Sequence, residues 1–237
     1  MLVSISQHHV TLHPYAHSAS ITNSNITMII PTNRETVGER IRKAYSLIQK
    51  TTGSIGGNSH GSAIYGEITM VSMQRIVQLM KQHTNLGPCS RFIDVGCGLG
   101  KPNIHIALDP GVEFSYGIEI DRIRWVLGMN NLDICLKETI EEAPQSKQNE
   151  RFLHHCILEH GDITNEKSFD PFTHVYMFDV GFPQTLLQKL AEIYNFSQSQ
   201  YLICYHGPKI MKKHGFEIEL IQKVETKMHG SGRSHTG

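Results

Sequence analysis

The chain has 237 residues and equal numbers of basic and acidic side chains, 22 of each, so its formal net charge is zero. A chain of this length suits one main domain with a substantial core. A neutral molecule lacks the long-range field that would draw it onto nucleic acid or a membrane, and no apolar run approaches the about 20 residues that span a bilayer. The five cysteines are odd in number and show no paired spacing, which argues against a disulfide framework or a metal site and predicts a reducing compartment.

The first 33 residues contain no Lys, Arg, Asp or Glu. They therefore lack the basic start of a secretory signal and the arginines of an organellar transit peptide. Four histidines occur in this segment at irregular spacing: His8, His9, His13 and His17. We interpret residues 1–33 as a flexible tail, with metal binding as the alternative.

Residues 34–90 form an N-terminal helical segment in our interpretation. Apolar residues recur at helical spacing over 34–50 and again over 67–83. A polar stretch rich in glycine and serine lies between the two helices. Residues 54–61 of this stretch are interpreted as an ordinary linker, and a lid that orders over a ligand is the alternative.

From Arg91 onward, short apolar runs alternate with helical stretches, which predicts a doubly wound α/β core over 91–237 with a mainly parallel sheet. The last run, residues 216–228, reads as one arm of a terminal hairpin whose second strand is missing. The predicted strands cover residues 91–95, 113–120, 151–162, 173–180 and 200–207, and the predicted helices cover residues 101–108, 121–142, 183–196 and 208–214.

Three glycines follow the first predicted strand of this core: Gly96, Gly98 and Gly100. In a doubly wound sheet the ligand lies where that strand turns into its helix, and glycines there allow close backbone approach. A phosphate-binding P-loop is excluded because Pro102 follows Lys101, and the spacing G-x-G-x-G differs from the dinucleotide fingerprint.

Acidic residues at three strand ends narrow the choice of ligand. Asp94 precedes the glycines, where a carboxylate would repel a pyrophosphate but accept a hydrogen bond from an ammonium group, which favours S-adenosylmethionine. Glu119 ends the next strand, 25 residues later, where it can accept from both ribose hydroxyls. Asp162 closes the following strand and could accept from the adenine amino group. The alternative for each is a solvated loop carboxylate.

The stretches "DVGCGLGK", "YGIEI" and "HGDIT" resemble, in order and spacing, the motifs of class I S-adenosylmethionine-dependent methyltransferases. "YGE" at residues 65–67 is similar to the cofactor-covering segment of the non-SET histone lysine methyltransferases named for disruption of telomeric silencing, and the chain resembles their divergent protozoan members. The resemblance implies a seven-stranded methyltransferase sheet, with its last strand possibly truncated here. It also implies S-adenosylmethionine as cofactor, S-adenosylhomocysteine as product, histone H3 in nucleosomes as substrate, and a nuclear location.

Candidate site residues follow from these motifs. Lysine must be desolvated before it can attack a methyl group, so aromatic walls are expected near the sulfur. Two departures from the resemblance concern Lys101, where the best-known members have Gln, and Asp179, which replaces the first residue of an Asn-Asn-Phe stretch. The candidate cofactor-binding residues are Tyr65, Glu67, Asp94, Gly96, Gly98, Gly100, Lys101, Glu119, Asp162, Ile163 and Asp179, and the candidate catalytic residues are Tyr65, Phe178, Asp179 and Phe182.

Other functions stay open at this point. "DVGFP" contains the acid, aromatic and proline of nucleic-acid amino methyltransferases in a different order, and a small-molecule substrate or a cofactor-binding module without turnover are further alternatives. Without a histone substrate, a cytoplasmic location is expected, and the oligomeric state is undetermined. The C-terminal lysines predict a weak DNA contact or a solvated helix face, and they are Lys209, Lys212, Lys213, Lys223 and Lys227.

Overall fold

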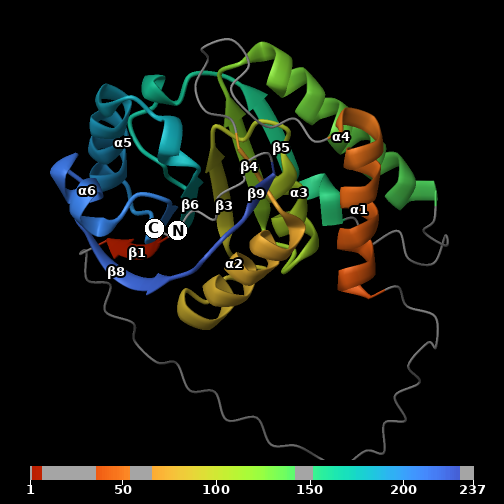
Figure 1. Ribbon diagram of the computed structural model, residues 1–237, viewed down its shortest axis with the longest axis horizontal. Helices are drawn as coiled ribbons and strands as arrows, with labels where there is room; N and C mark the ends of the chain where they lie inside the picture. Colours follow the sequence, from red (N-terminus) through yellow and green to blue (C-terminus); the bar gives the residue numbers. More distant parts are fainter. Residues whose placement is uncertain (1, 7–35, 54–65, 142–151, 230–237) are drawn as a thin grey trace, which may run out of the picture.

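The computed structural model describes residues 2–6, 36–53, 66–141 and 152–229 (Figure 1). None of the helices in these four ranges has the length and apolar character that a membrane crossing requires. Tyr65, the four N-terminal histidines and the glycine-rich stretch 54–61 lie outside the described residues.

A seven-stranded sheet forms the centre of the molecule, in the order β5-β4-β3-β6-β7-β1-β8. The five neighbouring strands β5, β4, β3, β6 and β7 are parallel to one another, and β1 is antiparallel to both of its neighbours. The predicted doubly wound α/β fold is therefore confirmed. The strands are β1 Leu2–Ser6, β3 Arg91–Val95, β4 Phe114–Glu119, β5 Cys156–His160, β6 His174–Met177, β7 Tyr201–Cys204 and β8 Ile218–Lys223.

Helices cover both faces of the sheet, because the central strands carry apolar side chains on both sides. Phe92 and Tyr176 pack on the face covered by α2, whereas Ile93 and Val175 pack on the face covered by α5. Figure 1 shows α5 and α6 at one end of the molecule and α1 and α4 at the other. The helices are α1 Val37–Thr52, α2 Met70–His83, α3 Lys101–Leu108, α4 Arg122–Glu141, α5 Gln184–Phe196 and α6 Pro208–Lys213.

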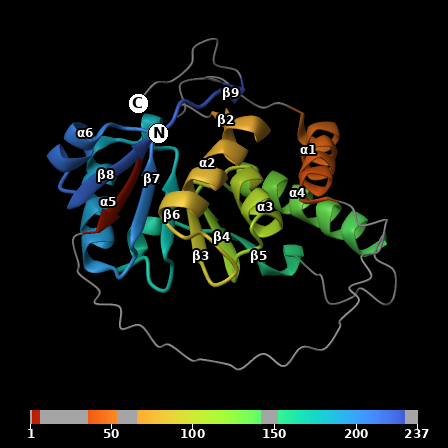
Figure 2. The same cartoon turned by 90° about the horizontal axis from the view of Figure 1, so that it is seen from below.

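The N-terminal strand β1 overturns two expectations. Leu2–Ser6 lies between β7 and β8 and pairs with both, so this part of the chain is not a tail (Figure 2). The partner strand that we expected to be missing beside residues 216–228 is therefore supplied from the N-terminus. A run without charges can be buried in a sheet as readily as it can form a tail, and its composition alone did not distinguish the two.

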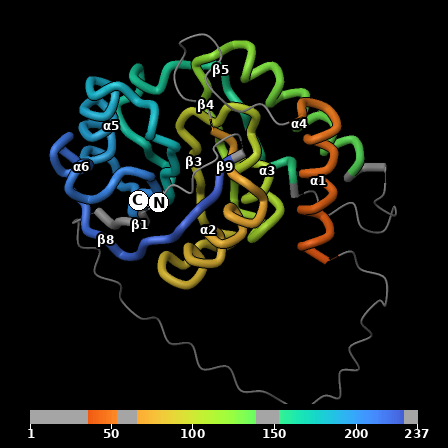
Figure 3. The backbone as a smooth tube through the Cα atoms, in the orientation of Figure 1, coloured from red at the N-terminus to blue at the C-terminus, as the bar shows by residue number. Residues whose placement is uncertain are grey.

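Three predicted elements begin or end differently from the pattern. Residues 152–155 form a 3-10 turn, η2, before β5, and β6 is followed by a second such turn, η4 Asp179–Gly181. The predicted helix at 67–83 begins with a two-residue strand, β2 Glu67–Ile68, which pairs with β9 Met228–His229. Figure 3 follows the blue chain from β8 across the molecule to β9.

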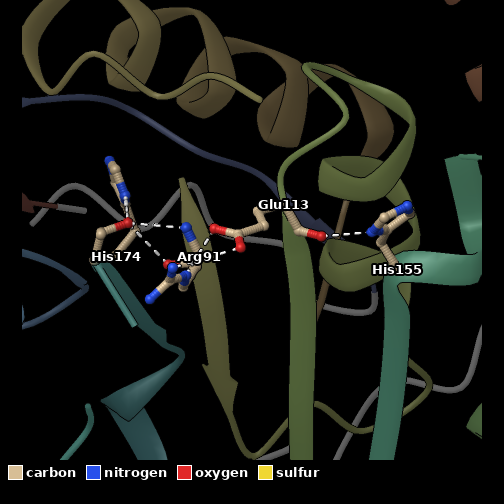
Figure 4. Close-up of polar contacts among 5 residues, drawn as sticks. Arg91, Glu113, His155 and His174 are labelled. Atoms are coloured by element: carbon tan, nitrogen blue, oxygen red, sulfur yellow. Dashed lines mark hydrogen bonds and ion pairs between the residues drawn. The ribbon is translucent and has the colours of Figure 1, made fainter. Parts of the chain in front are cut away.

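Polar contacts tie the amino ends of the parallel strands together (Figure 4). Arg91 Nε donates to Glu113 Oε2 at 2.7 Å, and the carbonyl oxygen of Glu113 lies 2.6 Å from Nδ1 of His155. The Thr173 hydroxyl, which lies 2.8 Å from Nδ1 of His174, donates to the carbonyl oxygen of Arg91 at 3.0 Å. These contacts lie opposite the carboxyl ends of the strands, which is where open α/β sheets bind their ligands.

Candidate functional site

The glycine loop after β3 adopts a backbone that other residues would resist. Gly96, Gly98 and Gly100 have φ values of 77°, 54° and 74°. These values lie in the left-handed region, where a Cβ atom is strained and glycine is not. The backbone conformation of the loop therefore requires glycine at these three positions.

The amides of this loop already have acceptors within the protein. Those of Gly96 and Cys97 donate to the carbonyl oxygen of Ile118, at 2.9 and 3.1 Å. The amide of Gly98 donates to Glu119 Oε2 at 2.8 Å. A phosphate site needs several free backbone amides. The loop is therefore unsuited to a pyrophosphate, in agreement with the sequence argument.

Two further glycines, which the sequence analysis missed, let the sheet and α4 approach the loop. A Cβ on Gly117 would lie 2.7 Å from Cβ of Cys97, and one on Gly128 would lie 2.9 Å from the carbonyl oxygen of Gly98. Neither position carries a local turn signal. Their role depends on which elements meet in three dimensions.

A pocket opens beside the loop, at the point where the order of strands reverses between β3 and β6. Five of the candidate site residues line it, although they come from three separate parts of the chain. The lining residues are Gly66, Glu67, Ile68, Asp94, Gly96, Cys97, Leu99, Lys101, Pro102, Tyr176 and Phe178.

Asp94 gives the pocket its chemical character. Its side chain lines the pocket, is only 2% exposed and forms no hydrogen bond with any residue that the structure describes. Burial raises the pKa of this carboxyl group well above its usual value, and the negative charge of Glu119 raises it further. A cationic ligand group that donates hydrogen bonds would relieve both effects. This acceptor thus fits the ammonium group of S-adenosylmethionine.

Lys101 and Glu67 form a buried ion pair in the wall of the same pocket. Their side chains are 6% and 1% exposed. Lys101 opens α3, and Glu67 lies in β2, so the pair joins the N-terminal segment to the helix that follows the glycine loop. This pairing explains how a lysine is accommodated at a buried position, because an isolated charge there would be costly.

Aromatic side chains form another wall, which Tyr176 and Phe178 line, while Phe182 lies beside the glycine loop outside the pocket lining. Phe178 packs on Gly66, where an added Cβ would lie 3.0 Å from its ring, and Phe182 packs on Gly96, where the corresponding distance is 3.6 Å. Tyr176, two residues before Phe178, also lines the pocket, and its hydroxyl lies 2.9 Å from that of Tyr205. The sequence analysis missed Tyr176, although side chains two residues apart on a strand share a face.

The other two predicted acids lie at the carboxyl ends of β4 and β5. Each Glu119 oxygen accepts one backbone amide, from Gly98 and Asp121, both at 2.8 Å, so each retains a second lone pair. Asp162 Oδ1 accepts from the amide and hydroxyl of Thr164. Neither Glu119 nor Asp162 is among the pocket-lining residues, and Ile163 is buried beneath Asp162 in the core.

Asp179 is fully buried in η4 and forms hydrogen bonds with the two residues that follow β7. Its Oδ1 accepts from the amide of Tyr205 at 2.7 Å, and its Oδ2 lies 2.8 Å from Nδ1 of His206. Asp179 does not line the pocket. The sequence analysis missed His206, although its place two residues after a parallel strand puts it at the ligand-binding edge.

Comparison with protein families gives one match. Residues 57–140 match the family model described as histone methylation protein DOT1. This part of the chain contains β2, the glycine loop, Lys101 and Glu119, and therefore most of the candidate cofactor-binding residues. No curated protein sequence matches the chain.

Solved structures of low sequence identity are also similar to the chain. A candidate RNA methyltransferase from Pyrococcus horikoshii is 15% identical with a TM-score of 0.48, over 81% of this chain and 92% of that one. A methyltransferase from Thiobacillus denitrificans in complex with S-adenosylhomocysteine is 15% identical with a TM-score of 0.39, over 70% and 52%. One from Geobacter sulfurreducens, with the same ligand, is 15% identical with a TM-score of 0.38, over 64% and 51%.

Proposed function

We propose that this chain is a class I S-adenosylmethionine-dependent methyltransferase of the DOT1 type and that it transfers methyl groups to a lysine of histone H3 in nucleosomes. The observation that supports this most directly is the buried Asp94 carboxylate, which has no hydrogen bond within the described residues and lines a pocket with aromatic walls. Such a pocket suits a ligand that carries positive charge and no phosphate.

Residues at the ends of different strands bind different parts of the cofactor in this proposal. When bound, S-adenosylmethionine supplies a methyl group on a positively charged sulfur. Asp94 accepts from the ammonium of its amino-acid part, and Glu119 accepts from its ribose hydroxyls. Asp162 Oδ2, which makes no hydrogen bond within the described residues, accepts from the adenine amino group. Gly96, Gly98 and Gly100 keep the loop backbone close to the ligand.

The aromatic wall suits a lysine acceptor. A lysine side chain has a pKa of about 10.4 in water and must lose a proton before it can attack. Phe178 and Phe182 exclude water beside the glycine loop and so favour the neutral amine. Asp179 keeps the turn between these two rings in place through its contacts with β7. Tyr65, which lies outside the described residues, is proposed as a further catalytic residue on the resemblance alone.

Exposed lysines supply a surface for nucleosomal DNA. Lys209, Lys212 and Lys213 lie on α6, which follows β7 at the carboxyl edge of the sheet. The described residues provide no acidic partner for these three, nor for Lys223 and Lys227. Lysines of this kind can neutralise DNA phosphates with little sequence preference. Action on nucleosomes implies a location in the nucleus.

Methyl transfer from labelled S-adenosylmethionine tests the proposal. The protein is offered nucleosomes, free histones, RNA and DNA in parallel, and mass spectrometry locates any labelled residue. We expect label on a lysine of H3, with nucleosomes preferred to free histones. Label on a nucleic-acid base would overturn the substrate assignment. Calorimetric binding of S-adenosylhomocysteine without label on any acceptor would establish a cofactor-binding module instead.

A further inference from the structure

The carboxyl ends of five parallel strands lie along one edge of the sheet, in the order β5, β4, β3, β6 and β7. Four of them lead into candidate site residues: Asp162, Glu119, Asp94 and Phe178. The fifth, β7, leads into His206, to which no role has yet been given.

The order of the strands places His206 on the acceptor side of the pocket. Glu119 and Asp162 follow β4 and β5, so the adenosine part of the cofactor extends to that side of β3. β6 and β7 lie on the other side of β3. Phe178 and the turn that carries Phe182 follow β6, and His206 follows β7, the next strand in the sheet. Neighbouring strands are about 4.8 Å apart, so the backbone of His206 lies about one strand spacing from that of Phe178.

The His206 ring has a fixed orientation and one nitrogen available. Its Nδ1 lies 2.8 Å from Asp179 Oδ2, and the fully buried Asp179 is itself fixed by the amide of Tyr205 at 2.7 Å. A carboxylate accepts, so Nδ1 carries the hydrogen and Nε2 has a free lone pair. Nε2 makes no hydrogen bond with the described residues, and a quarter of the side chain, 25%, is exposed.

The surroundings make this imidazole more basic. The hydrogen bond to Asp179 raises the pKa of His206 above its usual value and outweighs the opposing effect of burial. Within the described chain, Asp179 is the charged group that acts on the ring. The neighbouring Cys204 thiol donates to the carbonyl oxygen of His206 and remains neutral, because burial raises its pKa.

We propose that His206 is the base that removes the proton from the substrate lysine, with Asp179 as its positioning residue; this inference rests on the proposed function. The ammonium gives one proton to Nε2, which leaves a neutral amine and an imidazolium paired with Asp179. The amine nitrogen then forms a bond to the methyl carbon as the carbon–sulfur bond breaks, and that electron pair stays on sulfur. His206 releases its proton to solvent before the next transfer.

The test compares His206→Gln and Asp179→Asn with a matched surface variant, His154→Gln, whose side chain is exposed. We expect His206→Gln to lower kcat/KM on nucleosomes about 100-fold at pH 7, within the range for a lost general base. It should also remove the acidic limb of the pH profile. S-adenosylhomocysteine should bind both variants as it binds the wild type, within about twofold, because Asp179 and His206 follow β6 and β7, on the other side of β3 from the strands whose ends are assigned to the adenosine part.

A titration of the histidine ring protons by nuclear magnetic resonance gives a readout without turnover. The His206 resonance should titrate above the usual range in the wild type and return to that range in Asp179→Asn. The control His154→Gln should leave the titration of His206 and the activity unchanged. A His206→Gln variant with wild-type kcat/KM and pH profile overturns the inference and leaves the proposed function intact. A wild-type protein that labels no acceptor overturns both. Parallel losses of activity, cofactor affinity and thermal stability would assign His206 a structural role and also overturn the inference.

Discussion

At the scale of single residues, the protonation of Asp94 links stability to ligand binding. Its pKa is raised in the folded protein, by burial first and by Glu119 second. The unfolded chain releases this proton near pH 4, while the folded protein retains it to higher pH. Each step in pH above about 4 therefore lowers the free energy of unfolding, until the pH passes the pKa of the folded protein. Without a ligand, Asp94→Asn should melt at a higher temperature than the wild type at pH 7.5, and the difference should disappear near pH 4.

The same variant should bind the cofactor poorly. A hydrogen bond to a charged group contributes about 1.5–3 kcal/mol, so we expect Asp94→Asn to weaken S-adenosylhomocysteine binding by at least about tenfold in calorimetry. Asp133→Asn on the surface of α4 is the matched control, because its partner Lys137 forms an exposed pair worth less than about 0.5 kcal/mol. Equal melting temperatures of the wild type and Asp94→Asn at every pH would contradict the raised pKa of Asp94 in the folded protein.

Gly128 provides a second test at this scale, because its substitution sets two effects against each other. Alanine is favoured over glycine inside a helix by about 1 kcal/mol. At Gly128, however, the new Cβ would lie 2.9 Å from the carbonyl oxygen of Gly98, and overpacking of this kind typically costs about 1–3 kcal/mol. Gly128→Ala should therefore lower thermal stability and cofactor affinity. Gly38→Ala, in α1, has its nearest contact at 3.6 Å and should be neutral or stabilising. A stabilised Gly128→Ala would show that the loop can move away from α4.

The residues differ in how readily sequence reveals them. Gly96, Gly98 and Gly100 could be predicted because a local turn requires them, and Asp94 and Glu119 because each ends an apolar run. Gly117 and Gly128 could not, since their need for glycine arises where β4 and α4 meet the loop. The contact between Asp179 and His206 joins residues 27 apart, and nothing in either local pattern announces it.

At the scale of elements, β1 is the strand that sequence reasoning could not place. The runs at 91–95 and 101–108 belong to a repeated alternation of short apolar runs and helical stretches, which predicted a strand and a helix there, and both elements were confirmed. Leu2–Ser6 stands apart from this alternation, and its partners lie about 200 residues away in the chain. Strand pairing over such distances depends on the assembled sheet, which a local pattern does not encode.

Proline in β1 tests this placement. Because β1 is paired on both sides, the amide of each residue faces one neighbour or the other, and proline removes it. Ile5→Pro should lower the free energy of unfolding by about 3 kcal/mol or more, measured by urea denaturation. Ile5→Val keeps the amide and a β-branched side chain, and should cost no more than about 1.5 kcal/mol. If Ile5→Pro unfolds at the same urea concentration as the wild type, Leu2–Ser6 does not lie within the sheet.

At the scale of the whole molecule, the residues that match the family model include the ones that line the cofactor side of the pocket. The match over residues 57–140 covers the side of the pocket that we assign to the cofactor. Phe178, Asp179 and His206 lie outside it, in the segments that follow β6 and β7. One of the two departures from the resemblance, at "FDVGFP", lies on the acceptor side, and the other, Lys101, lies within the matched residues. The proposed function therefore assigns the cofactor and the acceptor to different parts of one sheet.

The C-terminal strand adds a connection between the end of the chain and the cofactor side. β2 contributes Glu67 and Ile68 to the pocket and pairs with β9 in a separate two-stranded sheet. The amide of Lys227 donates to the Ser72 hydroxyl at 2.7 Å, and its carbonyl oxygen accepts from the amide of Thr69 at 3.1 Å. The segment before β9 thus anchors β2 to the start of α2.

Loss of this anchor should weaken cofactor binding although Lys227 does not line the pocket. Lys227→Pro removes the amide that donates to Ser72, whereas Lys227→Ala keeps it and removes only the exposed side chain. A lost hydrogen bond is worth about 1 kcal/mol, so Lys227→Pro should weaken S-adenosylhomocysteine binding about fivefold in calorimetry, while Lys227→Ala binds as the wild type does. Because bound ligand stabilises the folded state, the rise in melting temperature at a fixed ligand concentration should also be smaller in Lys227→Pro. Equal affinities for the two variants would mean that β2 keeps its position in the pocket without the C-terminal strand.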